Sequence, residues 1–472
     1  MIPVLVVGGG PVGMTAALLL ARAGVPSVVL EAAGERVAAG SRSICVQHDV
    51  LQVLERVGAG RAVVDAGVTW YRARTFVRGR EVLTVELPRR RGFPPFVNTP
   101  QTEVERVLEA RVRAEPLVDL RYGERVVGLR QGATVRVTTE GGAYEGSHCL
   151  AADGVKSTVR DLLGIGFPGH SYEDLFVIAD IRVDLGHREP ERLFHFDPAW
   201  NPGRQVLLHP QPGGVHRIDW QVPEGFRLTD EHIRRITGSH PYEVLWQSTY
   251  RFHQRRATRL RDGRVLLVGD SAHVMSPFGA RGLNSGICDA DNAVWKVVLD
   301  RAGEAGPALL PSYELERGAA ADENLRVTGE TMRFLVPRTA AERAHRRAVL
   351  EGGDAGLIDS GRLFEPFAYR DSPLPAPAAR ARWRATAGGS APASRWRTGP
   401  SSARTATSPP SARTRARHCA APRASPTPER AAWTGPQPDR AAWTGPRRRS
   451  APHAAEPVVR GRCRSAPSSA AR

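Results

Sequence analysis

Short apolar runs alternate with helix-like patterns through the first part of the chain. Residues 4–7 form an aliphatic, mostly β-branched run before a glycine-rich turn, and apolar residues then recur at helical spacing from Met14 to Ala21. A second apolar run at residues 28–30 ends in Glu31. Strand, turn, helix and strand in this order predict the first unit of a mostly parallel α/β sheet.

The glycine-rich turn carries the pattern G-x-G-x-x-G on Gly8, Gly10 and Gly13, and Glu31 follows 18 residues after Gly13. Glycines at these positions let the backbone approach a pyrophosphate, which the N-terminus of the next helix attracts. An acid at the end of the second strand can bind a ribose hydroxyl. The alternative is a plain glycine turn, and the pattern alone does not separate FAD from NAD.

A later stretch predicts a second loop that faces the same kind of ligand. A buried strand at residues 265–268 is followed by Asp270 and a glycine-rich loop. We expect a helix to begin near Leu283, with Asn284 and Ser285 as its candidate caps. Bare N–H groups at such a helix end suit an electron-rich ring that gains negative charge when it is reduced.

Three other positions are candidate ligand contacts. A strand near residue 150 delivers Asp153 before a new helix, and ligands of open α/β sheets lie at such strand ends. Arg42 is either a phosphate clamp or a solvated loop residue. Gln101 comes just before a helix, where its amide either reaches a ligand or caps the helix.

Residues 170–260 change character, because helical spacing fades and aromatic and β-branched residues alternate with polar ones. This pattern predicts an antiparallel sheet, whose isolated histidines, His209 among them, we interpret as ordinary strand or surface residues. The predicted domains are residues 1–169 (first part of the nucleotide domain), 170–260 (substrate sheet), and 261–373 (second part and C-terminal helices). A cleft between the two layers would hold a small-molecule substrate.

The last part of the chain has a different composition. Residues 374–472 hold 19 Arg and only 3 acids, whereas residues 1–373 are nearly neutral at +1. Since Val, Ile, Leu and Phe are almost absent from it, we expect this tail to be disordered. It is either a basic tail that contacts acidic partners or the product of an out-of-frame reading, and we favour the second. The neutral remainder gives no reason to expect a nucleic-acid or membrane partner.

The N-terminus shows no basic region before an apolar run, and no apolar run reaches membrane-spanning length. The 5 Cys are scattered without a C-x-x-C pair, which argues against a disulfide framework or a metal site. We therefore expect a cytoplasmic protein without a metal ion.

Taken together, three segments resemble the class A FAD-dependent aromatic monooxygenases: residues 8–31, the Asp153-Gly154 pair, and Gly269-Asp270 with its loop. The loop S-P-F-G-A-R-G-L-N-S-G and the following D-A-D-N-A-V-W-K are most similar to phenol, resorcinol and hydroxyphenylpropionate hydroxylases and related polyketide hydroxylases. The resemblance covers roughly residues 3–375. It implies a Rossmann-like FAD domain of the glutathione-reductase type, interrupted by a mixed or antiparallel substrate sheet, then C-terminal helices and the tail.

The resemblance also implies roles for the candidate residues. Gly8, Gly10 and Gly13 would hold the FAD pyrophosphate, and Glu31 the adenosine ribose. The remaining implied contacts are Arg42 and Gln101 with the phosphate and ribityl parts, Asp153 and Arg160 in the motif shared by FAD and NAD(P)H, Asp270 with the ribityl chain, Gly282, Leu283 and Asn284 with the flavin N1 and O2 edge, and Pro277 beside the ring where oxygen reacts.

The implied activity is hydroxylation of a phenolic or polyketide aromatic substrate with NAD(P)H and O2, through a flavin C4a-hydroperoxide. No single catalytic side chain is assigned. The expected partners are the aromatic substrate, O2 and a second copy of the chain in a homodimer. The alternatives are another flavin oxidoreductase (an epoxidase, an oxidase or a halogenase) or an inactive FAD-binding protein. A halogenase would be expected to carry W-x-W-x-I-P, which this sequence lacks.

Overall fold

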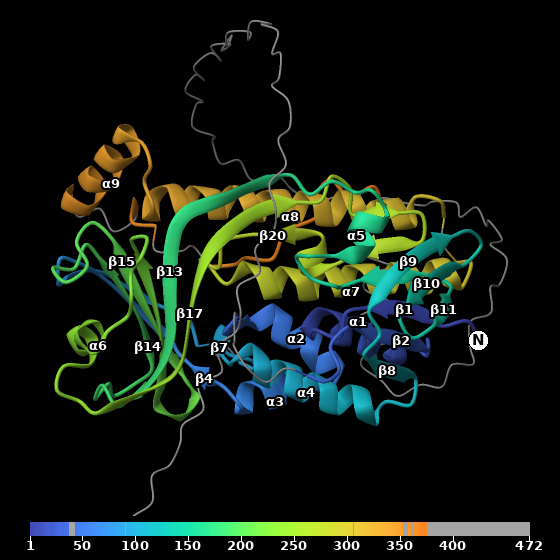
Figure 1. The fold of residues 1–472 in the computed structure, drawn as a ribbon, viewed down its shortest axis with the longest axis horizontal. Coiled ribbons are helices and arrows are strands. Elements are labelled where there is room, and N and C mark those ends of the chain that lie inside the picture. Colours follow the sequence, from blue (N-terminus) through green and yellow to red (C-terminus); the bar gives the residue numbers. More distant parts are fainter. Residues whose placement is uncertain (37–42, 90, 305, 353–356, 360–362, 375–472) are drawn as a thin grey trace, which may run out of the picture. The chain divides into compact units, whose positions relative to one another are not determined.

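We describe the protein from a computed structural model, which covers residues 1–36, 43–89, 91–304, 306–352, 357–359 and 363–374. Arg42 and the tail from residue 375 lie outside the described residues, so the predictions made for them stay predictions. Figure 1 shows the described part as mixed α/β, with one sheet among helices and a second sheet beside it.

The first sheet has six strands in the order β18-β19-β12-β1-β2-β8. All neighbours pair in parallel except β18, which is antiparallel to β19. The strands are β1 (Val4–Val7), β2 (Ser27–Glu31), β8 (Val118–Tyr122), β12 (Cys149–Ala151), β18 (Arg261–Asp262) and β19 (Val265–Leu267). The three central strands β1, β12 and β19 are wholly buried, because helices cover this sheet as parallel sheets require.

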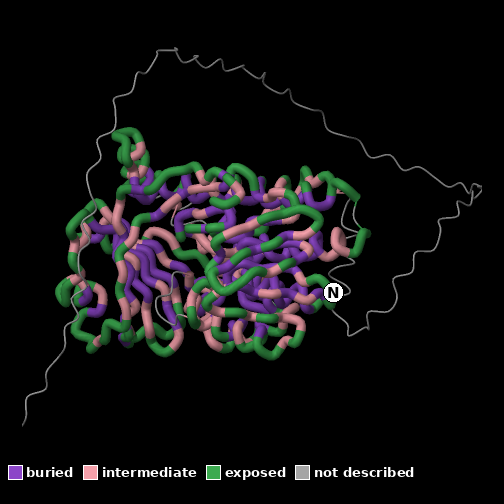
Figure 2. Tube along the Cα trace, turned by 45° about the vertical axis from the view of Figure 1, so that its right-hand side comes forward, coloured by how far each residue is buried: buried purple, intermediate pink, exposed green. Residues whose placement is uncertain are grey.

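Three long helices pack beside this sheet or on one another: α1 (Pro11–Arg22), α4 (Gln101–Ala114) and α7 (Arg281–Arg301). Apolar residues of the sheet and of these helices form one large hydrophobic core. The predicted strand–turn–helix–strand unit at the N-terminus is present, since β1, α1 and β2 follow one another and β1 pairs with β2. Figure 2 shows the buried positions gathered in the interior of the described part, with exposed positions along the outer turns.

Two small antiparallel sheets are formed by strands that lie between β2 and β12 in the sequence. One has the order β11-β10-β9 and the other the order β3-β7-β4. Their strands and the adjacent helices are β3 (Cys45–Gln47), β4 (Val68–Thr69), β7 (Phe96–Asn98), β9 (Val126–Gln131), β10 (Val135–Thr139), β11 (Ala143–Gly146), α2 (His48–Arg56), α3 (Gly60–Asp65) and α5 (Thr158–Leu162).

The second large sheet has eight strands in the order β20-β17-β13-β16-β15-β14-β5-β6. Its strands are β5 (Arg72–Val77), β6 (Arg80–Glu86), β13 (Gly169–Val183), β14 (Glu191–Phe196), β15 (Gln205–Gln211), β16 (Val215–Val222), β17 (Tyr242–Arg256) and β20 (His273–Val274). Every pair is antiparallel except β14 with β5. The antiparallel sheet expected in residues 170–260 is therefore present, and β5 and β6 extend it from an earlier part of the chain.

The remaining helices are α6 (Asp230–Thr237), α8 (Leu309–Leu335) and α9 (Ala340–Gly352), with short 3-10 turns at Pro212–Gly214 and Gly269–Ser271. Helix α8 packs against α7 and β17 and so connects the two large sheets, whereas α6 covers the far side of the second sheet (Figure 1). The domain boundaries given above stay a prediction.

Candidate functional site

Three loops meet at one edge of the first sheet. Strands β1, β12 and β19 are parallel neighbours, so their carboxyl ends lie side by side. Backbone bonds continue past the strands, because Ala152 N donates to Val7 O at 2.7 Å and Val268 N donates to Ala151 O at 2.9 Å. The residues that follow these strand ends, Gly8, Asp153 and Asp270, therefore belong to neighbouring loops.

The first loop shows why its glycines are needed. Gly8 has φ of 103°, and a Cβ there would lie 2.3 Å from Ala152 O. A Cβ on Gly13 would lie 2.0 Å from Gly8 O, so helix α1 packs against the turn with no room for a side chain. Around Gly10, by contrast, no protein atom lies within 4 Å of an added Cβ. The loop is thus closed on its protein side and open at Gly10.

Glu31 holds the first loop in place. Its Oε2 accepts a hydrogen bond from Gly9 N at 2.7 Å, and its Oε1 accepts one from Ala33 N at 2.9 Å. The carboxylate is only partly buried. Glu31 therefore lies against the glycine turn, where the sequence places it.

Asp153 and Arg160 organise the second loop. Ser157 Oγ donates to Asp153 Oδ1 at 2.6 Å, and Val159 N donates to Asp153 Oδ2 at 3.0 Å. Burial raises the pKa of Asp153, and the hydrogen bond from Ser157 opposes this shift. The buried Arg160 donates to Ser271 O at 3.2 Å, which ties this loop to the third one.

The third loop is fixed by a buried ion network that the sequence reasoning missed. Asp289 is fully buried and its Oδ2 accepts from Gly269 N at 2.9 Å, immediately before Asp270. Its two oxygens also contact Arg317 Nε at 2.5 Å and His273 Nε2 at 2.8 Å. Burial alone would raise the pKa of Asp289, but Arg317 and His273 outweigh it and hold this pKa below its usual value. Asp270 itself is exposed at the loop surface.

Helix α7 begins slightly earlier than expected. It starts at Arg281, after Ala280 in a left-handed conformation with φ of 56°, so the prediction that Asn284 and Ser285 cap it is wrong. Asn284 is buried inside the first turns, where its side chain accepts from Gln47 N at 3.1 Å and donates to Cys45 O at 2.9 Å. Its polar groups are used to hold strand β3 against the helix.

The other candidates near this helix differ in exposure. Gly282 has no protein atom within 4 Å of an added Cβ, and Leu283 is half-buried. Pro277 is exposed, whereas its neighbour Phe278 is buried. Gln101 is the first residue of α4, and its Nε2 donates to Glu105 Oε1 at 2.8 Å.

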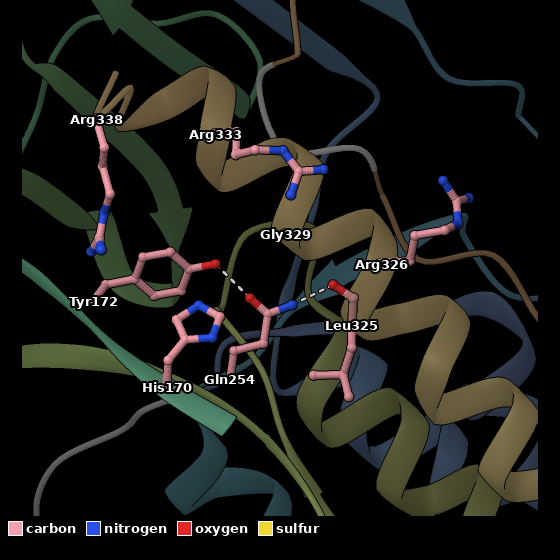
Figure 3. Close-up of a pocket in the computed structure, with 8 residues that line it drawn as sticks. All are labelled: His170, Tyr172, Gln254, Leu325, Arg326, Gly329, Arg333 and Arg338. Carbon is pink, nitrogen blue, oxygen red and sulfur yellow. Dashed lines mark hydrogen bonds between the residues drawn. The ribbon is translucent and has the colours of Figure 1, made fainter. Parts of the chain in front are cut away.

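A separate hollow lies between α8 and the strands β13 and β17 of the second sheet (Figure 3). It has a volume of about 270 Å³ and is lined by His170, Tyr172, Gln254, Leu325, Arg326, Gly329, Arg333 and Arg338. Gln254 links the two sides of the hollow, because it accepts a hydrogen bond from the Tyr172 hydroxyl of β13 at 2.5 Å and donates one to Leu325 O of α8. Arg326 is neutralised by Glu323 and Glu330. None of the sequence-derived candidates lines this hollow.

Within the described ranges, no His, Cys, Asp and Glu side chains gather in a group of three or more that could bind a metal ion. In the same residues, no helix is both long and apolar enough to cross a lipid bilayer.

Known proteins are similar to this chain in both sequence and fold. The sequence profile of the family described as "FAD binding domain" matches residues 1–328. A 3-(3-hydroxy-phenyl)propionate/3-hydroxycinnamic acid hydroxylase of Mycobacterium sp. (strain KMS) is 30% identical over 366 residues, which are 74% of this chain and 62% of the hydroxylase. The chain thus spans less than two thirds of the length of that relative.

An anhydrotetracycline monooxygenase of Streptomyces rimosus is 35% identical over 352 residues, covering 69% of this chain and 68% of that enzyme. The solved structure of p-nitrophenol 4-monooxygenase from Pseudomonas putida DLL-E4 superposes with a TM-score of 0.66 at 25% identity, over 76% of this chain and 95% of that one. The profile match, these relatives and the convergence of the three loops lead to one conclusion: the chain belongs to the family of class A FAD-dependent aromatic monooxygenases.

Proposed function

We propose that this protein is an FAD-dependent monooxygenase that uses NAD(P)H and O2 to hydroxylate a phenolic or polyketide aromatic substrate. The observation that carries the proposal is the meeting of the Gly8, Asp153 and Asp270 loops at one sheet edge, in a chain related to hydroxylases of both substrate types. FAD, when bound, supplies the acceptor for the hydride and the activation of O2. The protein supplies position, electric field and exclusion of water.

The first loop fits the pyrophosphate of FAD. Its protein side is closed by the contacts of Gly8 and Gly13, and its open side is at Gly10, before the N-terminus of α1. A helix N-terminus that carries bare N–H groups attracts an anion. Glu31 lies at the end of the adjacent strand β2, where a carboxylate can accept a bond from a ribose hydroxyl. We propose that these four residues hold the adenosine diphosphate half.

The other candidates would hold the flavin half. The exposed carboxylate of Asp270 would bind ribityl hydroxyls, with Asp153 and Arg160 fixing the neighbouring loop. The backbone amides of Gly282, Leu283 and Asn284 begin helix α7, and their dipoles favour the negative charge that a flavin gains near N1 on reduction. Gln101 and Pro277 complete this proposed set, Pro277 beside the face where oxygen reacts.

The finer description of the fold is part of the same proposal. The six-stranded sheet with α1 and α7 would be a Rossmann-like FAD domain of the glutathione-reductase type, and the eight-stranded sheet would carry the substrate. Its first-sheet strand order, with the glycine turn after a central strand, supports this description.

The test is NAD(P)H oxidation by the purified holoprotein against a panel of phenols and polyketide quinones, with product analysis. We expect an aromatic substrate to accelerate NAD(P)H oxidation and to appear as a hydroxylated product in a ratio near one to the NAD(P)H consumed. If every tested substrate leaves only hydrogen peroxide as product, the protein is an oxidase and the monooxygenase proposal is wrong.

A further inference from the structure

The eight-stranded sheet has two faces of different chemistry. Side chains of the outer face, such as Val177, Ile218 and Trp220, pack with α6 in an apolar cluster. Because side chains alternate along a strand, the residues between them point the other way. We call this second side the inner face, and its residues on β13 to β16 include Phe176, Ile178, Asp180, Arg192, Phe194, Gln205, Leu207, His209, Arg217 and Asp219.

The register places two rows next to each other on the inner face. In one row Leu207 pairs with Asp219 and Asp219 pairs with Ile178. In the next row His209 pairs with Arg217, which pairs with Asp180. An acid in a mostly apolar row therefore lies beside a row of charged and polar groups.

The inner face contacts the loop before α7 on one side and Trp70, just after β4, on the other. The ring of Phe278, from that loop, lies 5.6 Å from Phe176 and 6.4 Å from Phe194, measured between ring centroids. On the other side, the Arg192 guanidinium lies 6.0 Å from the centroid of the Trp70 ring. Burial raises the pKa of Cys45, and the positive charge of Arg192 opposes this rise.

Cys45 also leads back to α7, because its carbonyl oxygen accepts the bond from Asn284. Asp219 lies in the sheet between these two contacts, since its row includes Phe194 and the adjacent row includes Arg192. The inner face around Asp219 therefore faces the start of α7, where we propose that the edge of the flavin lies.

Asp219 has no side-chain partner within the described part of the chain, unlike the acid beside it. Asp180 forms a two-point ion pair with Arg217, at 2.7 Å to Nε and 2.6 Å to Nη2. Asp219 forms neither a hydrogen bond nor an ion pair there, and it is half-buried. Two neighbours on the inner face also have unused polar atoms in the described residues: both amide atoms of Gln205, which is 1% exposed, and Nδ1 of His209.

Buried polar atoms without a partner, such as those of Gln205 and His209, cost free energy and need an explanation, such as an ordered water or a bound ligand. The surroundings of Asp219 also shift its pKa toward neutral pH. Burial raises the pKa of Asp219 to about 7, with Arg217 lowering it and Asp180 raising it. A carboxylate of this kind is matched to proton transfer near neutral pH.

We propose that Asp219 is the general base that deprotonates the hydroxyl group of a phenolic substrate bound on the inner face. The inference rests on the function proposed above. The substrate's O–H bond breaks and a new O–H bond forms on the Asp219 carboxylate, while the electron pair stays on the phenolate oxygen. The phenolate donates electron density to its ring carbons, which makes them better nucleophiles toward an electrophilic oxygen. Arg217 and His209 lie next to the developing charge.

The first experiment measures the pH profile of kcat/KM for a phenol that the wild-type holoenzyme hydroxylates. We expect kcat/KM of the wild type to rise through an apparent pKa near 7. Asp219→Asn should lower kcat/KM by roughly 100-fold or more and remove this inflection. Asp219→Glu should restore part of it. Asp184→Asn, at an exposed acid directly after strand β13, is the matched control and should behave as wild type.

Substrate acidity separates a base from a structural residue. An acidic phenol such as p-nitrophenol is already ionised in mildly alkaline solution, so the loss in Asp219→Asn should shrink strongly for it. An equal loss for acidic and ordinary phenols, or an inflection that persists in Asp219→Asn with normal FAD content, would overturn the role of Asp219.

A binding experiment tests the inference without turnover. At pH 7 about half of Asp219 is ionised, whereas a phenol about one pKa unit less acidic than Asp219 is still mostly protonated in solution. Binding of such a phenol to the wild-type holoprotein should produce the absorbance band of the phenolate, because Asp219 takes the proton. Asp219→Asn should bind it without that band. Absence of binding, or the same spectrum with both proteins, overturns the inference. Failure of the wild type to hydroxylate any phenol, with the phenolate band present, instead counts against the proposed function alone.

Discussion

Two glycines of the first loop separate the needs of the fold from the needs of the cofactor. Gly13 and Gly10 both belong to the G-x-G-x-x-G turn, but an added Cβ meets Gly8 O at 2.0 Å from Gly13 and meets nothing within 4 Å from Gly10. Gly10 also has φ of −72° and ψ of 179°, which alanine adopts without strain. The same substitution at the two positions therefore tests two different claims.

We expect Gly13→Ala to destabilise the protein without its ligand. The distance between the methyl group and the backbone oxygen of Gly8 must increase by about 1 Å or more, so α1 has to move away from β1. Such overpacking costs about 1–3 kcal/mol. Gly10→Ala should change the free energy of unfolding of the apoprotein by less than about 0.5 kcal/mol, since the methyl group has free space. It should weaken FAD binding by at least about tenfold, or about 1.4 kcal/mol, because that space is where the pyrophosphate would lie.

The assay has two parts for each variant. Urea denaturation of the apoprotein gives the free energy of unfolding, and quenching of flavin fluorescence on titration gives the Kd for FAD. Binding of FAD by Gly10→Ala as tight as in the wild type would refute the proposed pyrophosphate position at Gly10, and so would destabilisation of the apoprotein as large as in Gly13→Ala.

Three further predictions concern other parts of the chain. Asp289→Asn should lower the free energy of unfolding by about 3–5 kcal/mol at neutral pH, because it leaves Arg317 buried with a broken ion pair. Asp322→Asn, at a pair whose carboxylate is exposed and whose Arg256 is half-buried, should cost less than about 1 kcal/mol. Chemical denaturation compares the two variants. Burial lowers the pKa of His209 from 6.5 to about 3, so between these pH values only the unfolded chain binds a proton there, and the free energy of unfolding falls as the pH is lowered. His209→Gln should reduce this fall by up to about 1.4 kcal/mol per pH unit. Equal slopes of the two proteins in a pH series of unfolding curves would contradict this. Removal of residues 376–472 should leave FAD content unchanged and abolish any salt-sensitive DNA binding. Binding that survives the truncation in a mobility-shift titration would place a nucleic-acid site in residues 1–375.

Strands β1, β2, β12 and β19 of the first sheet could be predicted because their signals are local, whereas the edge strands β8 and β18 were not. The apolar run before Gly8, the glycine spacing and the acid Glu31 lie within one short segment, and the structure brings them together as expected. The antiparallel character of residues 170–260 was also readable from alternation. The addition of β5 and β6 to that sheet was not, because the parallel pairing of β5 with β14 joins residues more than a hundred positions apart.

The parts of the site that the sequence did not reveal depend on distant partners. Asp289 stands in the D-A-D-N-A-V-W-K segment, but its role follows from contacts with Gly269, His273 and Arg317, none of which its neighbours indicate. An amide side chain favours a cap position for Asn284, yet its contacts with β3 decide its place inside the helix. Asp219 could not be assigned to a face until the strand register was known.

The most direct measurement is a titration of the purified protein with FAD, followed by the visible absorbance of bound flavin. We predict one tightly bound FAD per chain in the wild type, and a Kd for FAD at least about tenfold higher in Gly10→Ala without loss of folded protein. A colourless wild-type protein that added FAD does not restore would contradict the central claim that the three loops at this sheet edge form a flavin site.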